Sequence, residues 1–406
     1  MNVYEASKKR IALLFKEYDN VLVSFSGGKD SGIILNLCYE YAKENGLLHK
    51  LAMYHLDYEA QYSFTTDYVH DTFSRLTDIR RFWLCLPISA NCACKLDSDL
   101  WHPWEENERD RWCREMPCAS YVYNISNVPF NFQAGTYGKK TKEDFCNWFA
   151  GRYGKTVVVI GIRADESMDR QNAIRQFGWI VGQSGNYHKA YPIYDWKAQD
   201  IWVANGKFEW SYNQIYDLFY KAGLNISQMR VANPFHTCGL DNLKLYRVIE
   251  PNVWAKLLNR INGVNFGAIY GGTEAVGHKA LTKPKGFSWQ EYARFLIDTS
   301  PSRNYKEKIP QWAKKWQSQG YSNGIPDEAD LQMEKKRDVP SWRRVCKCIL
   351  SNDCTLKGLG FSQPKCGAYH MIKKITLSGM KLREGNIDPQ EQAETTSENL
   401  QQLLLF

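Results

Sequence analysis

The sequence predicts an α/β fold: a parallel, twisted sheet with helices on both faces, followed by a mostly helical C-terminal extension. Three observations carry this prediction. Apolar strand-like segments alternate with amphipathic helical segments through the first half of the 406-residue chain. A Ser/Gly-rich turn joins the first of these strands directly to a helix. Beyond about Asn233 the strand pattern stops and helical periodicity remains.

The sheet is predicted from five short apolar segments. They lie at Val21–Phe25, Leu51–Asp57, Phe82–Leu86, Thr156–Ile162 and Ala190–Ile193. An amphipathic helix is expected before them at Val3–Tyr18, and another follows the first strand at Gly32–Asn45. Strands that alternate with helices run parallel, which places helices on both faces of the sheet.

The change of pattern predicts three regions. An α/β domain is expected at residues 1–232, a mostly helical domain at residues 233–383, and a flexible tail at residues 384–406, which is rich in Gln, Glu, Ser and Asn. Helical spacing in the second region is found at Leu243–Ile249, Val253–Ile261, Trp289–Asp298 and Tyr305–Gln317.

Bulk composition limits the classes of protein. The formal net charge of +8 fits a nucleotide or nucleic-acid ligand as well as it fits a merely soluble basic protein. The first residues carry no apolar signal segment and no apolar run is long enough to cross a bilayer, so we expect a cytoplasmic protein with no membrane association. Twelve cysteines in such a chain argue against a disulfide framework.

The strongest motif is the hexapeptide Ser-Gly-Gly-Lys-Asp-Ser at Ser26–Ser31, directly after a predicted strand and before a predicted helix. Gly27 and Gly28 let the backbone approach an anion, and the helix start supplies free N–H groups and the positive end of its dipole. Lys29 adds a positive charge, and both serine hydroxyls can donate to phosphate oxygens. The pattern is not a Walker A loop. It predicts a pyrophosphate cradle, with an ordinary glycine-rich turn as the alternative.

This hexapeptide resembles the PP-loop of the ATP pyrophosphatases, which that family writes SGGKDS. Those enzymes cleave ATP between the α and β phosphates, adenylate a substrate and release pyrophosphate. The family includes the sulfate adenylyltransferase small subunit, tRNA-thiolating enzymes and the DNA phosphorothioation enzyme, and phosphoadenosine-phosphosulfate reductases share its fold. The resemblance implies an adenine nucleotide alpha hydrolase-like fold, with ATP and Mg²⁺ as ligands.

A second motif narrows the branch. The segment Gly161–Ser167 follows a predicted strand, with Arg170 shortly after it, and resembles the GxRxxES…R element of the sulfate-adenylylating and reductase group. Arg163 and Arg170 can pair with phosphate or sulfate oxygens, and Glu166 can orient one of them. A surface ion-pair cluster is the alternative.

Two further features resemble the same family. The segment Tyr191–Trp196 and the later Trp202 match its PI-x-W…D-V/I-W element, for which we favour a structural role in anchoring a helix against the sheet. Asp57, at the end of the second predicted strand, stands where the family places an acidic residue near the nucleotide. A solvated strand-end aspartate is an equal alternative.

The resemblance therefore implies a site with Lys29, Asp30 and Arg163 as catalytic residues. The implied nucleotide- and phosphate-binding residues are Ser24, Ser26, Gly27, Gly28, Lys29, Asp30, Ser31, Asp57, Gly161, Arg163, Glu166 and Arg170.

The second half of the chain resembles a less characterised subgroup, the immunoglobulin-binding regulator A-like proteins. The segments Arg111–Pro117 and Ser341–Cys348 carry this likeness. Members of the subgroup are often paired with a ParB/sulfiredoxin-like protein, so the resemblance implies such a partner.

The chain departs from the thioredoxin-dependent reductases in two respects. Their loop lacks the Lys-Asp pair, whereas this loop is intact, and they carry a Cys-Gly-Leu/Ile-His nucleophile near the C-terminus, whereas Gln401–Phe406 contains no cysteine. The tripeptide Cys238–Leu240 occurs in mid-chain, and we predict that Cys238 is not a nucleophile of the reductase kind.

Two sets of cysteines are clustered enough to consider a metal. They are Cys92, Cys94, Cys113 and Cys118, and Cys346, Cys348, Cys354 and Cys366. Four thiolates can hold zinc or an iron–sulfur cluster, but neither set has paired CxxC spacing. We favour ordinary buried thiols.

A basic cluster surrounds Trp342, with Lys335–Arg337 before it and Arg343, Arg344 and Lys347 after it. It could touch a nucleic-acid backbone, although a solvated face or an internal structural cluster is favoured.

Three functions are compatible with these residues. The favoured one is an ATP pyrophosphatase that adenylates an acceptor such as sulfate, a nucleic acid or a metabolite. The second is a thioredoxin-dependent phosphoadenosine-phosphosulfate reductase. The third is a regulator that binds a nucleotide or DNA without turnover.

Overall fold

The structure is a computed structural model, and most of the first 359 residues are described. The described residues are 2–95, 100–182, 185–226, 228–236, 239–265, 281–300, 302–318, 320–331, 334, 339–350, 353 and 356–359. The chain divides into two compact units, Met1–Thr273 and Glu274–Phe406. The expected tail at residues 384–406 lies outside the described residues.

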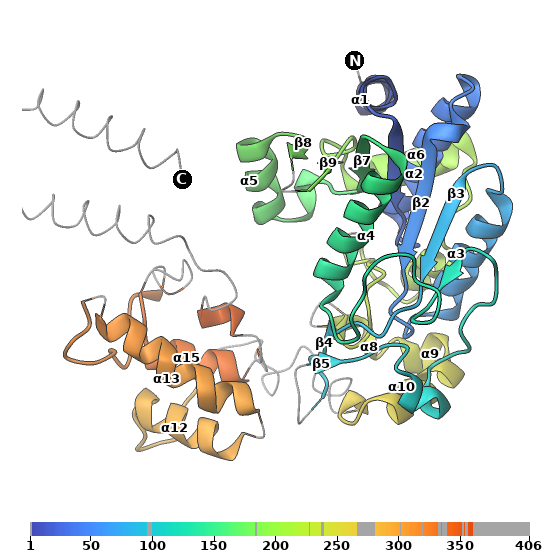
Figure 1. The fold of residues 1–406 in the computed structure, drawn as a ribbon. Coiled ribbons are helices and arrows are strands. Elements are labelled where there is room, and N and C mark those ends of the chain that lie inside the picture. The colour runs from blue at the N-terminus through green and yellow to red at the C-terminus, as the bar shows by residue number, and fades with distance from the viewer. Residues whose placement is uncertain are drawn as a thin grey trace, which may run out of the picture. The chain divides into compact units, whose positions relative to one another are not determined.

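The first unit is built on a seven-stranded sheet (Figure 1). Its strand order is β6-β3-β2-β1-β7-β9-β8, and every pairing is parallel except that of β8 with β9. The strands are β1 (Asn20–Ser24), β2 (Leu51–Leu56), β3 (Arg80–Leu84), β6 (Val122–Tyr123), β7 (Thr156–Val159), β8 (Ile180–Gly182) and β9 (Tyr187–Ala190), and a separate hairpin pairs β4 (Ala90–Asn91) with β5 (Leu100–Trp101). The predicted α/β class is confirmed.

Helices cover both faces of this sheet. Their bounds are α1 (Val3–Glu17), α2 (Lys29–Glu44), α3 (Ser63–Arg75), α4 (Gly138–Tyr153), α5 (Met168–Phe177), α6 (Ala198–Phe208) and α7 (Ile215–Lys221), with short 3₁₀ turns η1 (Leu48–Lys50), η2 (Glu106–Arg111) and η3 (Ala164–Glu166). Alternate residues of β1 enter opposite cores, because side chains along a strand point to alternate faces. Val21 and Val23 pack with helices α1, α2, α3 and α6. Leu22 packs with Phe145 and Phe149 of α4.

The first unit extends past the expected boundary at residue 232. It includes α8 (Leu240–Leu243), α9 (Tyr246–Ile249) and α10 (Pro251–Arg260). Glu250 accepts hydrogen bonds from the backbone N–H and the hydroxyl of Ser63, each 2.9 Å long. Arg260 forms a buried ion pair with Glu59, 2.9 Å from Nε to Oε1. The helices α8, α9 and α10, which we expected in the helical domain, thus lie in the first unit.

The second unit is helical in its described part. It contains α12 (Trp289–Thr299), α13 (Arg303–Ser318), α15 (Trp342–Leu350) and the 3₁₀ turn η5 (Lys357–Leu359), which share one apolar core. Arg344 is buried and donates to the carbonyls of Gly358 and Val339, and Arg343 pairs with Glu328 and Glu334. These two arginines form the internal cluster favoured above. Lys335–Arg337 lie outside the described residues.

Among the helices that the structure describes, none is both long and apolar enough to span a membrane.

Candidate functional site

The hexapeptide forms the turn between β1 and α2, as its position predicts. Gly27 has φ +75°, which side-chain-bearing residues rarely adopt, and a Cβ there would lie 2.7 Å from a methyl group of Val69. A second close approach lies at Gly161, whose Cβ would stand 2.7 Å from the carbonyl carbon and oxygen of Asp30. Gly161 is therefore needed to bring the two motifs of the site together, and Gly27 lets the loop pass close to α3.

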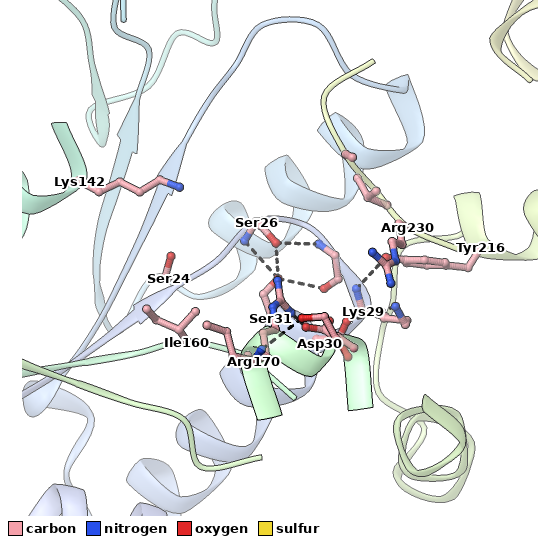
Figure 2. A pocket seen from close by; sticks show the side chains of 17 residues that line it. Ser24, Ser26, Lys29, Asp30, Ser31, Lys142, Ile160, Arg170, Tyr216 and Arg230 are labelled. Carbon is pink, nitrogen blue, oxygen red and sulfur yellow. Dashed lines mark hydrogen bonds and ion pairs between the residues drawn. The ribbon is translucent and has the colours of Figure 1, made fainter. Parts of the chain in front are cut away.

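Three backbone N–H groups of this loop donate to hydroxyl oxygens. The amide of Ser26 donates to Ser31 Oγ (3.1 Å), the amide of Gly28 to Ser26 Oγ (3.4 Å), and the amide of Lys29 to the phenol oxygen of Tyr216 (3.0 Å). Figure 2 shows these groups around the start of α2. Amides at a helix N-terminus that converge on oxygen atoms can equally receive the oxygens of a phosphate.

A cavity of about 450 Å³ opens beside the loop. The expected residues that line it are Ser24, Ser26, Gly28, Lys29, Asp30, Ser31, Gly161, Glu166 and Arg170. The expected residues Gly27, Asp57 and Arg163 are not among its lining.

Lys29 is almost buried, with 6% of its surface exposed, yet it reaches the cavity. Its ammonium group donates to the carbonyl oxygen of Met229 and pairs with Asp30, both at 3.2 Å. Burial lowers the pKa of Lys29; Asp30 opposes this change, and Arg163 and Arg230 add to it. An anion in the cavity would favour the charged form of this lysine.

Arg163 lies behind the cavity instead of in it. Its Nε donates to Asp30 Oδ1 at 2.6 Å, and its Nη1 pairs with Asp165. Asp165 in turn accepts from the backbone N–H of Ala198, at the start of α6 (3.2 Å). In this structure Arg163 positions Asp30 and the first turn of α2, and its expected contact with a phosphate stays a prediction.

Glu166 and Arg170 line the cavity and form an ion pair with each other. Glu166 also lies 3.8 Å from Arg163 Nη2. The second motif is thus an ion-pair cluster that also faces the cavity. Of the two arginines of that motif, Arg170 is the one that lines the cavity, where it pairs with Glu166.

Asp57 has a different environment from the two that we considered. It is fully buried, accepts from the indole N–H of Trp83 (2.6 Å) and the backbone N–H of Glu59 (2.8 Å), and pairs with Arg114. Burial raises its pKa, but Arg114 and then His55 outweigh that effect, so the net pKa of Asp57 is lowered. Asp57 is neither solvated nor part of the cavity lining, and it serves to fix the chain after β2.

Three functional candidates were missed at the level of sequence: Lys142 of α4, Tyr216 of α7 and Arg230. All three line the cavity. In Figure 2, Lys142 reaches toward the loop from one side, and Arg230 and Tyr216 lie on the other. Burial lowers the pKa of Lys142, and none of the described carboxylates pairs with it or with Arg230. Lys142 was missed because it stands in the lysine-rich run 139–142, and such a run is typical of a solvated helix face.

The two tryptophans of the third motif are structural. Trp196 is 1% exposed and donates to Ser7 Oγ of α1 at 2.7 Å. Trp202 packs edge-on against Tyr216, with 5.3 Å between ring centroids, and thereby supports the residue that contacts the loop.

The described cysteines of the second set are engaged with protein groups. Cys346 Sγ donates to the carbonyl oxygen of Trp289 (3.3 Å), and Cys348 Sγ to Asp353 Oδ2 (3.4 Å). Cys354, Cys366 and Cys238 lie outside the described residues. Within the described part of the chain, no three His, Cys, Asp or Glu side chains are grouped as metal ligands.

Comparison with known proteins assigns the family. Residues 20–222 match the phosphoadenosine phosphosulfate reductase domain. The chain belongs to this family. The resemblance read from the hexapeptide and from Gly161–Ser167 is thereby confirmed. Residues 223–324 and 321–369 match a domain of unknown function, DUF3440.

One curated relative matches nearly the whole chain. It is the uncharacterized protein YbdN of Escherichia coli (strain K12), 34% identical over 388 residues, with 91% of this chain and 93% of that protein covered. The alignment therefore includes both the region that matches the reductase domain and the region that matches DUF3440.

Solved structures match at low similarity. The FMN adenylyltransferase of Candida glabrata in complex with FAD and inorganic pyrophosphate is 15% identical, with a TM-score of 0.33 over 53% of this chain and 59% of that chain. The phosphoadenylyl-sulfate reductase of Candida auris is 12% identical, with a TM-score of 0.32 over 56% and 87%. These scores are too low to add to the family assignment.

Proposed function

We propose that this protein binds Mg-ATP in the cavity beside the hexapeptide loop and cleaves it between the α and β phosphates. An acceptor oxygen would attack the α phosphorus, pyrophosphate would leave, and the acceptor would carry AMP. The observation that carries the proposal is the intact loop at the start of α2, whose three amides each donate to a hydroxyl oxygen of a residue that lines the cavity.

The charges of the lining support a polyanionic ligand. Asp30 is already paired with Lys29 and Arg163, and Glu166 with Arg170. Lys142 and Arg230 have no described carboxylate partner, so positive charge is left over on both sides of the loop. Fixed cations aimed at phosphates stabilise the charge that develops on a pyrophosphate leaving group.

The cavity also fits the size of the ligand and of its metal. Its volume of about 450 Å³ falls in the range of small-molecule sites, about 300–1,000 Å³. Asp30, Ser26 and Ser31 present oxygen atoms there, which is the donor type that Mg²⁺ takes. The metal would neutralise phosphate charge, while the residues of the chain orient the triphosphate.

The acceptor belongs to one of the classes named above: sulfate, a nucleic-acid group or a small metabolite. The proposal thus places the protein in sulfur metabolism or nucleic-acid modification. A ParB/sulfiredoxin-like partner is proposed from the family resemblance, and a cytoplasmic location from the composition of the sequence.

The decisive experiment measures pyrophosphate release from Mg-ATP across pools of acceptors. The wild type is expected to release pyrophosphate with one pool. Lys29→Ala should lose about 2.7–4 kcal/mol of transition-state stabilisation, or roughly a hundred- to thousandfold in rate. The matched control is Lys139→Ala, because the Lys139 side chain is 87% exposed. Unchanged nucleotide affinity and turnover in the Lys29 variant would contradict the assignment.

The second candidate is reduction of an adenylylated sulfate, which the family name favours. That reaction needs a thiol at the substrate, and no cysteine is among the described residues that line the cavity. The comparison is sulfite production from phosphoadenosine phosphosulfate with thioredoxin, by the wild type and by Cys238→Ser. Sulfite from the wild type alone would establish the reductase.

A further inference from the structure

We propose that the region matched by DUF3440 supplies one wall of the nucleotide site, and that residues 229–232 hold the pyrophosphate end of the ligand against the hexapeptide loop. The match to the reductase domain, which contains the loop, ends at residue 222, and the DUF3440 match begins at residue 223. This inference rests on the proposed function, because both place a phosphate chain beside the loop, but it does not require that ATP is cleaved.

Residues from both sides of this boundary line one cavity. Residues 230–232 come from the DUF3440 match, whereas the loop and Tyr216 come from the match to the reductase domain. The carbonyl oxygen of Met229 accepts a hydrogen bond of 3.2 Å from the ammonium group of Lys29. Met229 is itself buried, so the segment is anchored directly before its cavity-lining residues. The boundary between the two matches therefore crosses the binding site.

Contacts further along the chain hold this segment in the first unit. Phe235 is fully buried and packs edge-on against Trp101, with 4.8 Å between ring centroids. The ring of Tyr246 stacks on that of Tyr62, with 3.6 Å between centroids. The hydrogen bonds of Glu250 to the start of α3 continue these contacts. Because aromatic rings bury large apolar areas, these contacts stabilise the first part of the DUF3440 match as part of the nucleotide-binding unit.

The charges at this wall favour an anion. Arg230 lies on the side of the loop where Lys29 is found (Figure 2), and none of the described carboxylates pairs with Arg230. Asp30, which pairs with Lys29, is shared with Arg163. Burial lowers the pKa of Lys29 first, and the charge of Arg230 adds to that effect. An anion between the two cations removes this repulsion, and a guanidinium group can donate to two phosphate oxygens at once.

The same charges indicate which end of the ligand lies at the wall. Lys29 is the first residue of α2, where the positive end of the helix dipole adds to the charges of Lys29 and Arg230. The terminal phosphates of a triphosphate carry more negative charge than the phosphate bonded to ribose, so this side attracts them most strongly. Inorganic pyrophosphate contains such phosphates without the nucleoside, and it therefore serves as the probe.

The wall is tested on the full-length protein by hydrogen exchange with inorganic pyrophosphate and Mg²⁺. Binding is expected to slow exchange in peptides that cover residues 27–31 and also in peptides that cover residues 229–233. Slower exchange at residues 27–31 alone overturns the wall and leaves the loop as an anion site. No change in either segment overturns the wall together with the proposed function. If both segments are protected and ATP is not cleaved, the wall stands and the proposed reaction fails.

The second measurement compares Arg230→Gln with the matched control Arg247→Gln. Both arginines are exposed residues of the region matched by DUF3440, so both variants are expected to fold, and of the two it is Arg230 that lines the cavity. Isothermal titration should show that Arg230→Gln weakens the binding of inorganic pyrophosphate by roughly ten- to a hundredfold, the usual loss for a hydrogen bond to a charged group. Arg247→Gln should bind it as the wild type does. Equal affinities of the two variants contradict the role of Arg230 in the wall.

Discussion

Arg163 Nε and Asp30 Oδ1 are joined by a hydrogen bond of 2.6 Å, which ties the loop after β7 to the first turn of α2. Gly161 reinforces this junction, since its α-carbon packs against the peptide of Asp30. The two family motifs, 133 residues apart at these positions, are therefore one physical unit. Arg163 holds Asp30 at the start of α2, and Arg170 lines the cavity.

This relationship predicts a stability effect at Arg163. Arg163→Met should lower the free energy of unfolding by about 3–5 kcal/mol, because removing one partner of a buried ion pair leaves the other charge uncompensated. Arg163 is 4% exposed and Asp30 15%. Urea denaturation measures the loss. The double variant with Asp30→Asn should recover part of it, and additive losses would contradict the coupling.

The strand–turn–helix around Ser26–Ser31 could be predicted because its signals are local. An apolar strand, two glycines and a helical pattern follow one another along the chain. The same holds for β2, β3 and β7, whose cores lie inside the predicted ranges. In contrast, β8 was missed because it is a three-residue edge strand without buried residues, paired antiparallel.

The rest of the site depends on contacts that are distant in sequence. Lys29 donates hydrogen bonds to Tyr216 and Met229, which lie 187 and 200 residues away in the sequence. Hydrophobic periodicity in the sequence cannot predict such distant contacts. The environment of Asp57 likewise depends on a contact that is distant in sequence. Its position at a strand end suggested a ligand, whereas Arg114, 57 residues later, binds its carboxylate. Local motifs locate the loop, but tertiary structure selects the side chains around it.

The lowered pKa of Lys29 predicts a pH dependence of nucleotide binding. A bound triphosphate favours the charged lysine and raises the pKa of Lys29 again, so binding takes up protons once pH passes the pKa of the free protein. That pKa lies below the ordinary 10.5. ATP affinity should therefore be constant at lower pH and fall as pH rises through this range.

Calorimetry in buffers of different ionisation heats measures that proton uptake. Lys29→Ala should reduce the uptake, and Lys142 accounts for the remainder because burial lowers its pKa too. Equal proton uptake in wild type and Lys29→Ala would contradict the linkage.

The backbone N–H of Lys29 donates to the phenol oxygen of Tyr216, and we expect a bound phosphate to replace the phenol at this amide. Tyr216→Phe removes the acceptor of the Lys29 N–H and should lower the stability of the free protein by about 1 kcal/mol. A bound phosphate would satisfy that amide, so the thermal shift induced by ATP should be larger in the variant than in the wild type. Tyr220→Phe, at an exposed position of the same helix, is the control. A smaller shift would show that the phenol contributes to the bound state.

The last prediction separates the two cations that lack a described carboxylate partner. Arg230 lies on the side of the loop where Lys29 and Tyr216 are found, and Lys142 reaches in from the other side, near Ser24 (Figure 2). We expect Arg230 to meet the distal phosphates and Lys142 the part of the ligand that AMP retains. A hydrogen bond to a charged group is worth about 1.5–3 kcal/mol. Arg230→Gln should therefore weaken ATP binding by roughly ten- to a hundredfold and leave AMP binding unchanged, while Lys142→Gln should weaken both.

Isothermal titration of ATP, ADP and AMP makes the comparison, with Lys139→Gln and Arg247→Gln as controls on exposed residues of unit 1. Equal effects of the two variants on all three nucleotides would show that the ligand does not extend across the loop, and would contradict the orientation assumed for the triphosphate.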